Sequence, residues 1–211
     1  MKYLIIAIKV LTIGTLAFIN PKNDFKTLSV GTKAPLTEFE MASTSGEKVS
    51  LDQLKKENGL LVMFSCNTCP FVVGTSDKEG WEGRYNELNE LCTSFKIGSI
   101  LVNSNEAKRP TGGDNMEDMV RRAKTMKYKM TYALDYDSKL ANAFGAKTTP
   151  HVFLFDKELK LIYSGKIDDN VNSKEAVKET FLRDAIINYI NGKDIDPFNT
   201  PALGCSIKRE G

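Results

Sequence analysis

From residue 59 onwards, apolar runs alternate along the chain with apolar stripes of helical spacing. Residues 59–64 form a continuous apolar run, typical of a strand that a sheet buries on both faces, and residues 97–102 predict a second such strand. Between these runs, large apolar side chains recur every three or four positions from Trp81 to Phe95, which predicts a helix with one buried stripe. This alternation of strands and helices is typical of an α/β fold with helices on both faces of the sheet.

The same alternation continues in the second half of the chain. Asp114, with Glu117 three residues later, predicts the capped start of another helix. The remaining expected elements are a short strand over residues 132–134, a short helix over 140–144, a hairpin of strands over 152–155 and 159–163, and a last helix from Asn172 or Ser173 to Asn191. Because a hairpin joins the last two strands while the earlier ones need crossovers, we expect a mixed central sheet.

An N-terminal β-hairpin is expected ahead of this α/β region. Residues 38–41 and 48–51 flank the turn sequence Ser45-Gly46-Glu47, and a glycine turn between two short strand-like segments is typical of a hairpin. The predicted architecture is therefore a mixed central sheet flanked by helices, with an N-terminal β-hairpin extension.

The first residues have the features of a secretory signal peptide. Lys2 gives a basic start, and residues 3–19 are apolar apart from Lys9 and three small polar or flexible positions. This segment falls slightly short of a hydrocarbon core of about 30 Å. Thr15-Leu16-Ala17 supplies a small-x-small cleavage site, so we expect export, cleavage near Ala17 and no stable membrane association afterwards. A buried strand and an uncleaved anchor are the alternatives.

Length and composition fit one globular domain with modest additions. The 211 residues are 41% hydrophobic and 27% charged, which argues against a disordered, collagen-like or multi-span membrane chain. The formal charge of +2 falls to zero when Lys2 and Lys9 are removed, so nucleic acid is not an expected partner. The expected divisions are a signal peptide over residues 1–17, a linker over 18–29, a domain over 30–192 and a tail over 193–211.

Candidate chemistry centres on Cys66 and Cys69, placed where a buried strand gives way to a helix. Backbone N–H groups at a helix start are unpaired and favour a thiolate, which is the attacking form of cysteine. Pro70 fits the first helical turn, since its missing N–H would be unpaired there. The pattern indicates a redox pair. Because Cys66 ends the strand and Cys69 lies one turn inside, we expect Cys66 to be the nucleophile.

The other cysteines and the single histidine offer little support for a metal site. A structural zinc needs four ligands, and His151, Cys92 and Cys205 are the only further candidates, so we expect no metal and no cofactor. Cys92 lies on the apolar stripe of its helix, and both it and His151 are expected in the core. Cys205 lies in a tail with nearby proline and glycine, where either a docked structural tail or a redox role is open.

Thr149 and Pro150 precede the apolar run of residues 152–155. Proline lacks a hydrogen-bond donor, so its place before a central strand favours a tight turn with a cis Thr149–Pro150 bond, although a trans proline at the first strand position is the alternative. Such a turn can lie against the cysteine loop and offer the backbone of Thr149 to an extended substrate.

These motifs occur together with several others, at residues 31–35, 66–72, 103–105, 149–156, 165–169 and 201–208. Taken together they resemble the thioredoxin-like superfamily, specifically its redoxin/AhpC-TSA branch, which includes TlpA-like and peroxiredoxin-like proteins. The resemblance implies a thioredoxin-like fold with Cys66 as attacking cysteine, Cys69 as resolving cysteine and Pro150 as the cis-proline. Leu60 replaces the buried acid of thioredoxins, which leaves Asp114 and Glu117 as candidate proton acceptors.

The expected function is that of an exported thiol–disulfide oxidoreductase. Its partners would be protein thiols and disulfides together with a further redox partner. One alternative is a thiol peroxidase, because Cys69-Pro70 resembles the peroxidatic cysteine of peroxiredoxins, with Cys66 at the position where these carry a threonine. A second alternative is a Cu(I)-binding module that uses Cys66, Cys69 and His151, since soft thiolates select Cu(I).

Overall fold

The structure is a computed structural model that describes residues 25–210. The expected signal peptide, residues 1–17, lies outside the described residues, as does the linker up to residue 24. Within the described range, no helix combines the length and the apolar character needed to cross a membrane.

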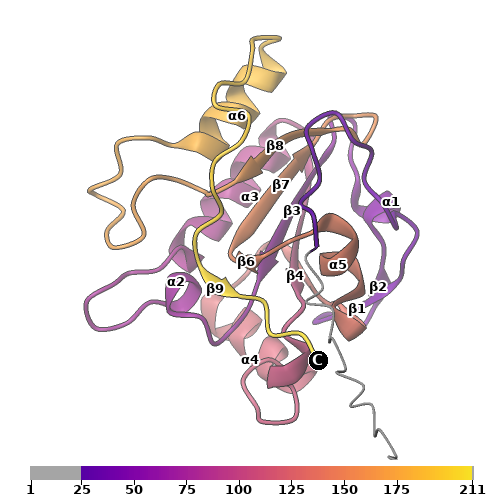
Figure 1. Cartoon of the computed structure of the whole chain (residues 1–211), viewed down its shortest axis with the longest axis vertical. Coiled ribbons are helices and arrows are strands. Elements are labelled where there is room, and N and C mark those ends of the chain that lie inside the picture. The colour runs from indigo at the N-terminus through magenta and orange to yellow at the C-terminus, as the bar shows by residue number, and fades with distance from the viewer. Residues whose placement is uncertain (1–24, 211) are drawn as a thin grey trace, which may run out of the picture.

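A seven-stranded mixed sheet forms the centre of the molecule, with the strand order β2-β1-β5-β4-β3-β7-β8 (Figure 1). Its strands are β1 (Met41–Ser43), β2 (Lys48–Val49), β3 (Leu60–Ser65), β4 (Gly98–Asn103), β5 (Thr131–Leu134), β7 (His151–Phe155) and β8 (Leu161–Gly165). β3, β4 and β5 run parallel, whereas β7 runs antiparallel to both β3 and β8. The expected mixed sheet is confirmed, and the apolar runs of β3 and β7 are buried along their whole length.

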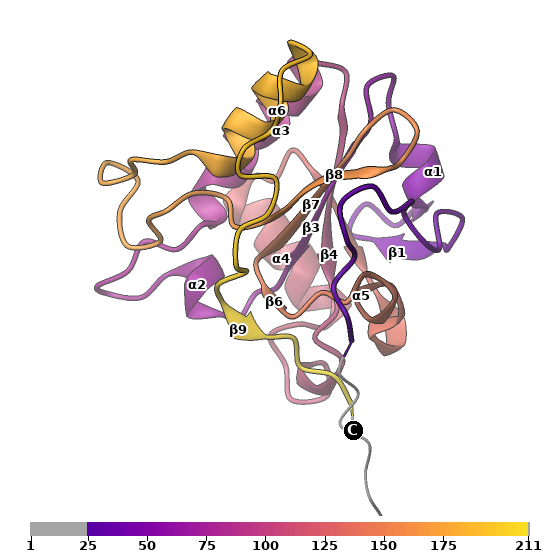
Figure 2. The same ribbon diagram turned by 45° about the horizontal axis from the view of Figure 1, so that its top comes forward.

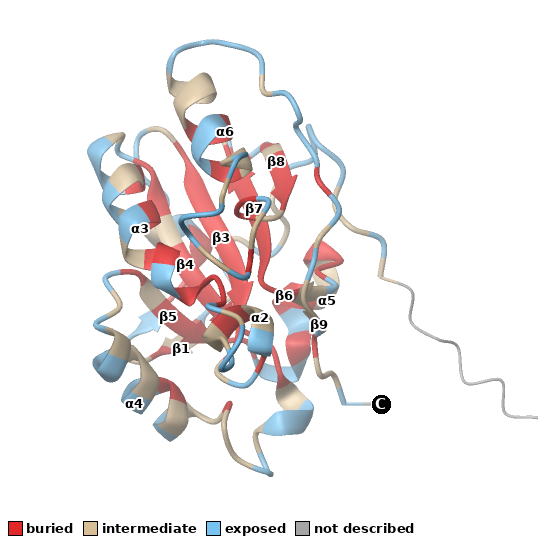
Figure 3. Cartoon of the chain, turned by 90° about the vertical axis from the view of Figure 1, so that its left-hand side faces the viewer, coloured by how far each residue is buried: buried red, intermediate tan, exposed pale blue. Residues whose placement is uncertain are grey.

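Helices cover both faces of the sheet and enclose two hydrophobic clusters (Figures 2 and 3). The helices are α1 (Leu51–Leu54), α2 (Pro70–Val73), α3 (Tyr85–Ser94), α4 (Met116–Met126), α5 (Lys139–Phe144) and α6 (Phe181–Ile190). Leu88, Met119 and Leu182 bring α3, α4 and α6 onto one face, whereas Leu51 and Phe144 bring α1 and α5 onto the other. Each fully buried side chain of this kind contributes about 1.5–3 kcal/mol.

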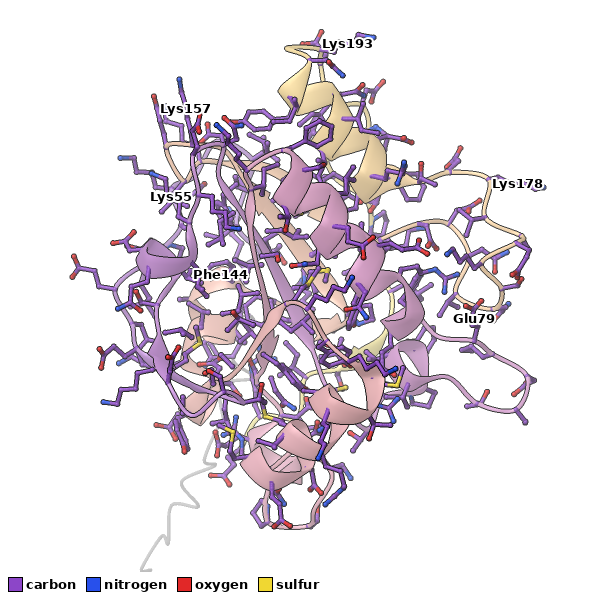
Figure 4. The ribbon with its side chains drawn as sticks, turned by 180° about the vertical axis from the view of Figure 1, so that it is seen from behind. Lys55, Glu79, Phe144, Lys157, Lys178 and Lys193 are labelled. Carbon is purple, nitrogen blue, oxygen red and sulfur yellow. The ribbon has the colours of Figure 1, made fainter. Side chains whose placement is uncertain are left out.

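Several lysine side chains lie at the periphery of these layers. Figure 4 shows Lys55, Lys157 and Lys193 at the outside of the molecule, whereas Phe144 lies within it. The ring of Phe144 packs edge-on against Phe64 of β3, with a centroid separation of 5.4 Å. The polar surface therefore surrounds a layered apolar interior, as the alternating pattern predicts.

The N-terminal hairpin is present and extends the sheet at one edge. β1 pairs antiparallel with β2 and, on its other side, with β5. The expected strand over residues 48–51 is too long, because Ser50 caps α1 instead. The Ser50 hydroxyl accepts from the Gln53 N–H, and the Gln53 side chain accepts from the Ser50 N–H. This reciprocal capping box begins a helix at Leu51.

Two further helix starts differ from expectation. The cap of α4 is Asn115, whose side chain accepts from the Asp118 N–H at 2.9 Å, rather than Asp114. α6 begins at Phe181, not at Asn172 or Ser173. The side-chain oxygen of Asn170 accepts from the N–H groups of both those residues, at 3.0 and 3.1 Å. Such local side-chain bonds favour a turn over a helix.

The tail contributes an unexpected strand. β9 (Cys205–Ser206) pairs antiparallel with β6 (Thr148–Thr149) in a separate two-stranded sheet. Before it, the N–H of Thr200 donates to Ser164 O at 3.0 Å, and after it the N–H of Ile207 donates to Lys147 O at 3.0 Å. In Figure 1 this yellow segment crosses the molecule between α2 and α5.

Candidate active site

The loop that carries Cys66 and Cys69 joins β3 to α2. Cys69 is the N-terminal cap of α2, and Pro70 is the first helical residue, as its missing N–H favours. The carbonyl of Cys69 accepts from the N–H groups of Val72 and Val73, at 2.8 and 2.9 Å. β3 ends at Ser65, one residue before Cys66, and α2 begins at Pro70, one residue after Cys69. The strand-to-helix transition expected from the sequence is therefore present, and the two cysteines lie at its two ends.

Asp114 holds this loop in place through hydrogen bonds to its backbone and side chains. Its fully buried carboxylate accepts from the Asn67 N–H and the Thr68 hydroxyl, both at 2.7 Å. It also accepts from the side-chain amides of Asn103 and Asn105, at 2.8 and 3.1 Å. Asp114 thus positions the cysteine loop through its hydrogen bonds. Asp114, Asn103 and Asn105 all lie in motifs that the sequence singles out, but no local pattern shows that they meet.

Thr149 and Pro150 lie against the two thiols. The Thr149–Pro150 peptide bond is cis. The Thr149 hydroxyl shares a hydrogen bond of 3.1 Å with Cys66 Sγ, and Cys69 Sγ lies 3.2 Å from Thr149 O. The structure therefore brings both cysteines and the Thr-Pro turn together, although they are some eighty residues apart in the chain.

The two thiols have opposite electrostatic environments. Both are buried, with exposed fractions of 1% for Cys66 and 3% for Cys69. Burial raises the pKa of Cys66 well above the ordinary thiol value, and its hydrogen bond to Cys69 and the charge of Asp114 raise it further. The pKa of Cys69 is lowered to about 5, first by the hydrogen bond with Cys66 and then by hydrogen bonds with Cys205, despite burial.

These environments give no support to the expectation that Cys66 carries the thiolate. Exposure does not favour Cys66, because neither sulfur is open to solvent. The helix begins at Pro70, so Cys69 and not Cys66 is the residue at its N-terminus. The direction of the two pKa shifts favours Cys69 over Cys66 as the thiolate.

Cys205 is a third thiol at this site. Its backbone N–H donates to Cys69 Sγ at 3.4 Å, and its pKa is raised to about 11 by burial and by contact with Cys69. Through the pairing of β9 with β6, the tail occupies the edge of Thr149 that was expected to receive an extended substrate. The docked tail left open by the sequence is thus present, and its cysteine contacts the redox pair.

Other candidate residues lie in the core or on the surface. Cys92 is buried on α3, and His151 accepts from the Lys147 N–H at 3.2 Å while burial lowers its pKa to about 3. Glu117, one of the candidate proton acceptors, has a 90% exposed side chain beside Arg121. Within residues 25–210, no three histidine, cysteine or acidic side chains are arranged to bind a metal.

One motif of the family resemblance has a structural role away from the cysteines. Asp168, in residues 165–169, is buried and accepts from Trp81 Nε1 at 2.6 Å and from Arg84 Nε at 2.9 Å. The carboxylate ties the loop after β8 to the turn before α3. A buried acid paired with two donors is satisfied there, so this motif stabilises the fold.

The central mixed sheet, the Cys-x-x-Cys loop before α2 and the proline turn beside it define a thioredoxin-like protein. Residues 29–180 match the family model Redoxin, and the chain belongs to the Redoxin family. This membership supports a thiol-based redox function. None of the curated proteins compared with the chain matches it.

Solved structures show the same fold. A hypothetical protein from Sinorhizobium meliloti 1021 is 28% identical, with a TM-score of 0.77 over 88% of this chain and 97% of that chain. Peroxidoxin BcpB from Mycobacterium tuberculosis is 11% identical, with a TM-score of 0.54 over 78% and 97% of the two chains. The exposed lipoprotein thioredoxin Etrx1 from Streptococcus pneumoniae strain TIGR4 is 19% identical, with a TM-score of 0.52 over 73% and 98%. The predicted thioredoxin-like fold is confirmed.

Proposed function

We propose that the protein is a thiol–disulfide oxidoreductase that exchanges disulfides with client proteins through Cys66 and Cys69. The observation that carries this proposal is the position of both sulfurs against Thr149, at 3.1 and 3.2 Å, beside the start of α2. The thiol-based function of the family and the thioredoxin among its structural neighbours support it.

The exchange begins at Cys69. Its thiolate attacks one sulfur of an incoming disulfide, forms a mixed disulfide and releases the other sulfur as a thiolate. Cys66 then loses its proton, attacks Cys69 Sγ and displaces the remaining sulfur. The Cys66 and Cys69 thiols lose two electrons and become a disulfide, and the incoming disulfide gains those electrons and becomes two thiols. The reverse sequence oxidises a client dithiol. Thr149 contacts both sulfurs and positions them for the second step.

A redox titration tests this proposal. The reduced protein is equilibrated in glutathione buffers of graded potential, the free thiols are alkylated, and the Cys66–Cys69 disulfide is measured by peptide mass spectrometry. We expect a single two-electron transition that Cys66→Ser and Cys69→Ser abolish and that Cys92→Ala, the matched core cysteine, leaves in place. A wild-type protein in which the two thiols stay reduced throughout would refute the proposal.

A thiol peroxidase is the second candidate, and the lowered pKa of Cys69 favours it. In that reaction the Cys69 thiolate attacks one peroxide oxygen, becomes a sulfenic acid and releases hydroxide or alkoxide. A brief exposure of Cys66→Ser to limiting peroxide separates the candidates by mass spectrometry. Rapid stoichiometric sulfenic acid at Cys69 supports the peroxidase, whereas slow oxidation with retained disulfide exchange in the wild type supports the oxidoreductase.

We further propose that the protein is exported, on the basis of the basic and apolar segment that ends near Ala17. N-terminal sequencing of the protein from its native cells tests this. A mature chain that begins near Phe18 is the expected result, and an intact Met1 on protein from the cytoplasm would contradict it.

A further inference from the structure

The tail is fastened on both sides of the cysteine site. Thr200 is buried, and its hydroxyl accepts from the Lys166 N–H at 2.9 Å. On the other side Ile207 is buried, and the N–H of Lys208 donates to the Asn105 side chain at 2.9 Å. Between these two anchors, Cys205 is directly opposite Thr149 in the pairing of β9 with β6. Figure 2 shows β9 beside β6.

The tail approaches the site closely. A Cβ built on Gly204 would lie only 2.2 Å from Thr149 O, so a side chain at this position would force the strands apart. Because the Cys205 nitrogen is 3.4 Å from Cys69 Sγ, the Cys205 Cα is no farther than about 4.9 Å from that sulfur. Cys205 therefore lies beside the sulfur with which it would form a disulfide.

Access to the three sulfurs differs. Cys66 and Cys69 are buried beneath the tail, whereas Cys205 is partly exposed. Cys69 Sγ interacts with both Cys66 and Cys205. A client protein therefore meets the sulfur of Cys205 before those of the internal pair.

We propose that Cys205 is a third catalytic cysteine, which relays the disulfide between the buried Cys66–Cys69 pair and a protein client. This inference rests on the proposed function. In the relay, the Cys205 thiolate attacks Cys69 Sγ of the Cys66–Cys69 disulfide. The bond between Cys66 and Cys69 breaks, the Cys69–Cys205 bond forms, and Cys66 leaves as a thiolate that takes up a proton. A client thiolate then attacks the sulfur of Cys205, and Cys69 leaves. The second client thiolate attacks the client sulfur of this mixed disulfide, so that a client disulfide forms and Cys205 leaves as a thiolate. The same steps in reverse reduce a client disulfide.

The electrostatics favour two parts of this relay, the attack by Cys205 and the departure of Cys69. In the reduced state the pKa of Cys205 is raised by burial and then by its hydrogen bond with Cys69 and the charge there. The last two causes vanish once Cys69 is in a disulfide, so Cys205 becomes more acidic in the state in which it must attack. When the client attacks, the leaving group is the Cys69 thiolate, whose pKa is lowered to about 5. A sulfur of low pKa leaves readily.

The first test traps the relay disulfide. Cys66→Ser is oxidised with a small excess of oxidised glutathione, the free thiols are alkylated, and disulfide-linked peptides are mapped by mass spectrometry. We expect a Cys69–Cys205 disulfide that is absent from Cys66→Ser/Cys205→Ser and present in Cys66→Ser/Cys92→Ala. Stable glutathione on Cys69 with Cys205 alkylated would overturn the proposal. Partial oxidation of the wild type, mapped in the same way, shows whether the Cys69–Cys205 disulfide also forms in a protein without substitutions. A folding defect of the variants cannot affect that result.

The second test measures exchange with a protein disulfide. Reduction of insulin by Cys205→Ser is compared with reduction by the wild type and by Cys92→Ala. We expect Cys205→Ser to be roughly tenfold slower or more, while dithiothreitol still reduces its Cys66–Cys69 disulfide. An unchanged insulin rate would overturn the relay and leave the proposed function standing. If the Cys66–Cys69 disulfide forms in neither protein, the proposed function itself fails.

Discussion

Cys69 and Cys92 are both buried thiols on the same face of the sheet, yet their chemistry differs. Burial raises the pKa of Cys92 to about 12. The pKa of Cys69 is lowered to about 5, although burial acts there too. Cys92 packs on the apolar stripe of α3, whereas Cys69 caps α2 beside two other thiols. Hydrogen bonds from Cys66 and Cys205 therefore outweigh burial at Cys69. Reactivity follows the neighbours of a sulfur rather than its exposure.

The largest expected effect is the difference in ionisation between these two thiols. At pH 7 the pKa values correspond to about 99% thiolate at Cys69 and about 0.001% at Cys92. Titration of the reduced protein by thiolate absorbance should show one group that ionises near pH 5. That step should disappear in Cys69→Ser and remain in Cys92→Ala. If all thiols of the wild type ionise above pH 8, the predicted difference in pKa between Cys69 and Cys92 is wrong.

The second effect is on the pH dependence of stability. The folded state lowers the pKa of Cys69 from 9.0 to about 5, so its contribution is present above pH 9 and is lost as the pH falls towards 5. Urea unfolding under reducing conditions should show the wild type gaining stability relative to Cys69→Ser across that window. Cys92 has the opposite sign, because its contribution is lost as the pH rises through about 12. A constant difference between wild type and Cys69→Ser from pH 5 to 9 would contradict the assignment.

A third effect concerns the loop that holds Cys69 in place. Asp114→Asn replaces one acceptor oxygen with a donor in a buried cluster of four donors, which should destabilise the protein by about 1–3 kcal/mol. Removing the charge should also lower the pKa of Cys66, which Asp114 raises. Urea melts and thiolate titration measure both. Glu117→Gln, an exposed neighbour on α4, is the matched control and should change stability by less than about 0.5 kcal/mol.

The smallest effect is expected at Thr149. Thr149→Val keeps the backbone that pairs with β9 but removes the hydroxyl bonded to Cys66 Sγ. Since this hydroxyl lowers the pKa of Cys66, that pKa should rise further. The thiol is protonated at pH 7 in either protein, so the reduction potential should move by less than about 30 mV. Thr148→Val, whose hydroxyl bonds to Pro150 O instead, should leave the pKa of Cys66 unchanged.

Much of the fold follows from local patterns in the sequence. The runs of β3 and β7 are continuously apolar because the sheet buries them on both faces, and the apolar side chains of α3 recur with the period of a helix. Both patterns are therefore clear in the sequence. The missed boundaries depend on single side chains. Ser50 and Gln53 begin α1 through a capping box that the strand-like pattern hid, and Asn170 holds a turn where the spacing of apolar residues favoured a helix.

The site was less accessible to sequence reasoning, because its chemistry is set over long distances. The Cys-x-x-Cys pair, Thr149 and Pro150 could be named from local motifs. The ionisation order could not, since it depends on where α2 begins and on Cys205, which is 136 residues from Cys69 in the chain. Asp114 has the sequence features of a helix cap, but the cap is Asn115, one position further on. A shift of a single residue thus freed a carboxylate to organise the cysteine loop.

The separation of Cys69 and Cys205 also has a consequence in time. A ribosome adds about 5–20 residues per second, so about 7–27 s pass between the synthesis of these two cysteines, 136 residues apart. During that interval β9 does not yet cover β6, and the Cys66–Cys69 pair is without its third sulfur. The nascent chain therefore exposes Cys69 before Cys205, one of the residues that lower its pKa, has been made.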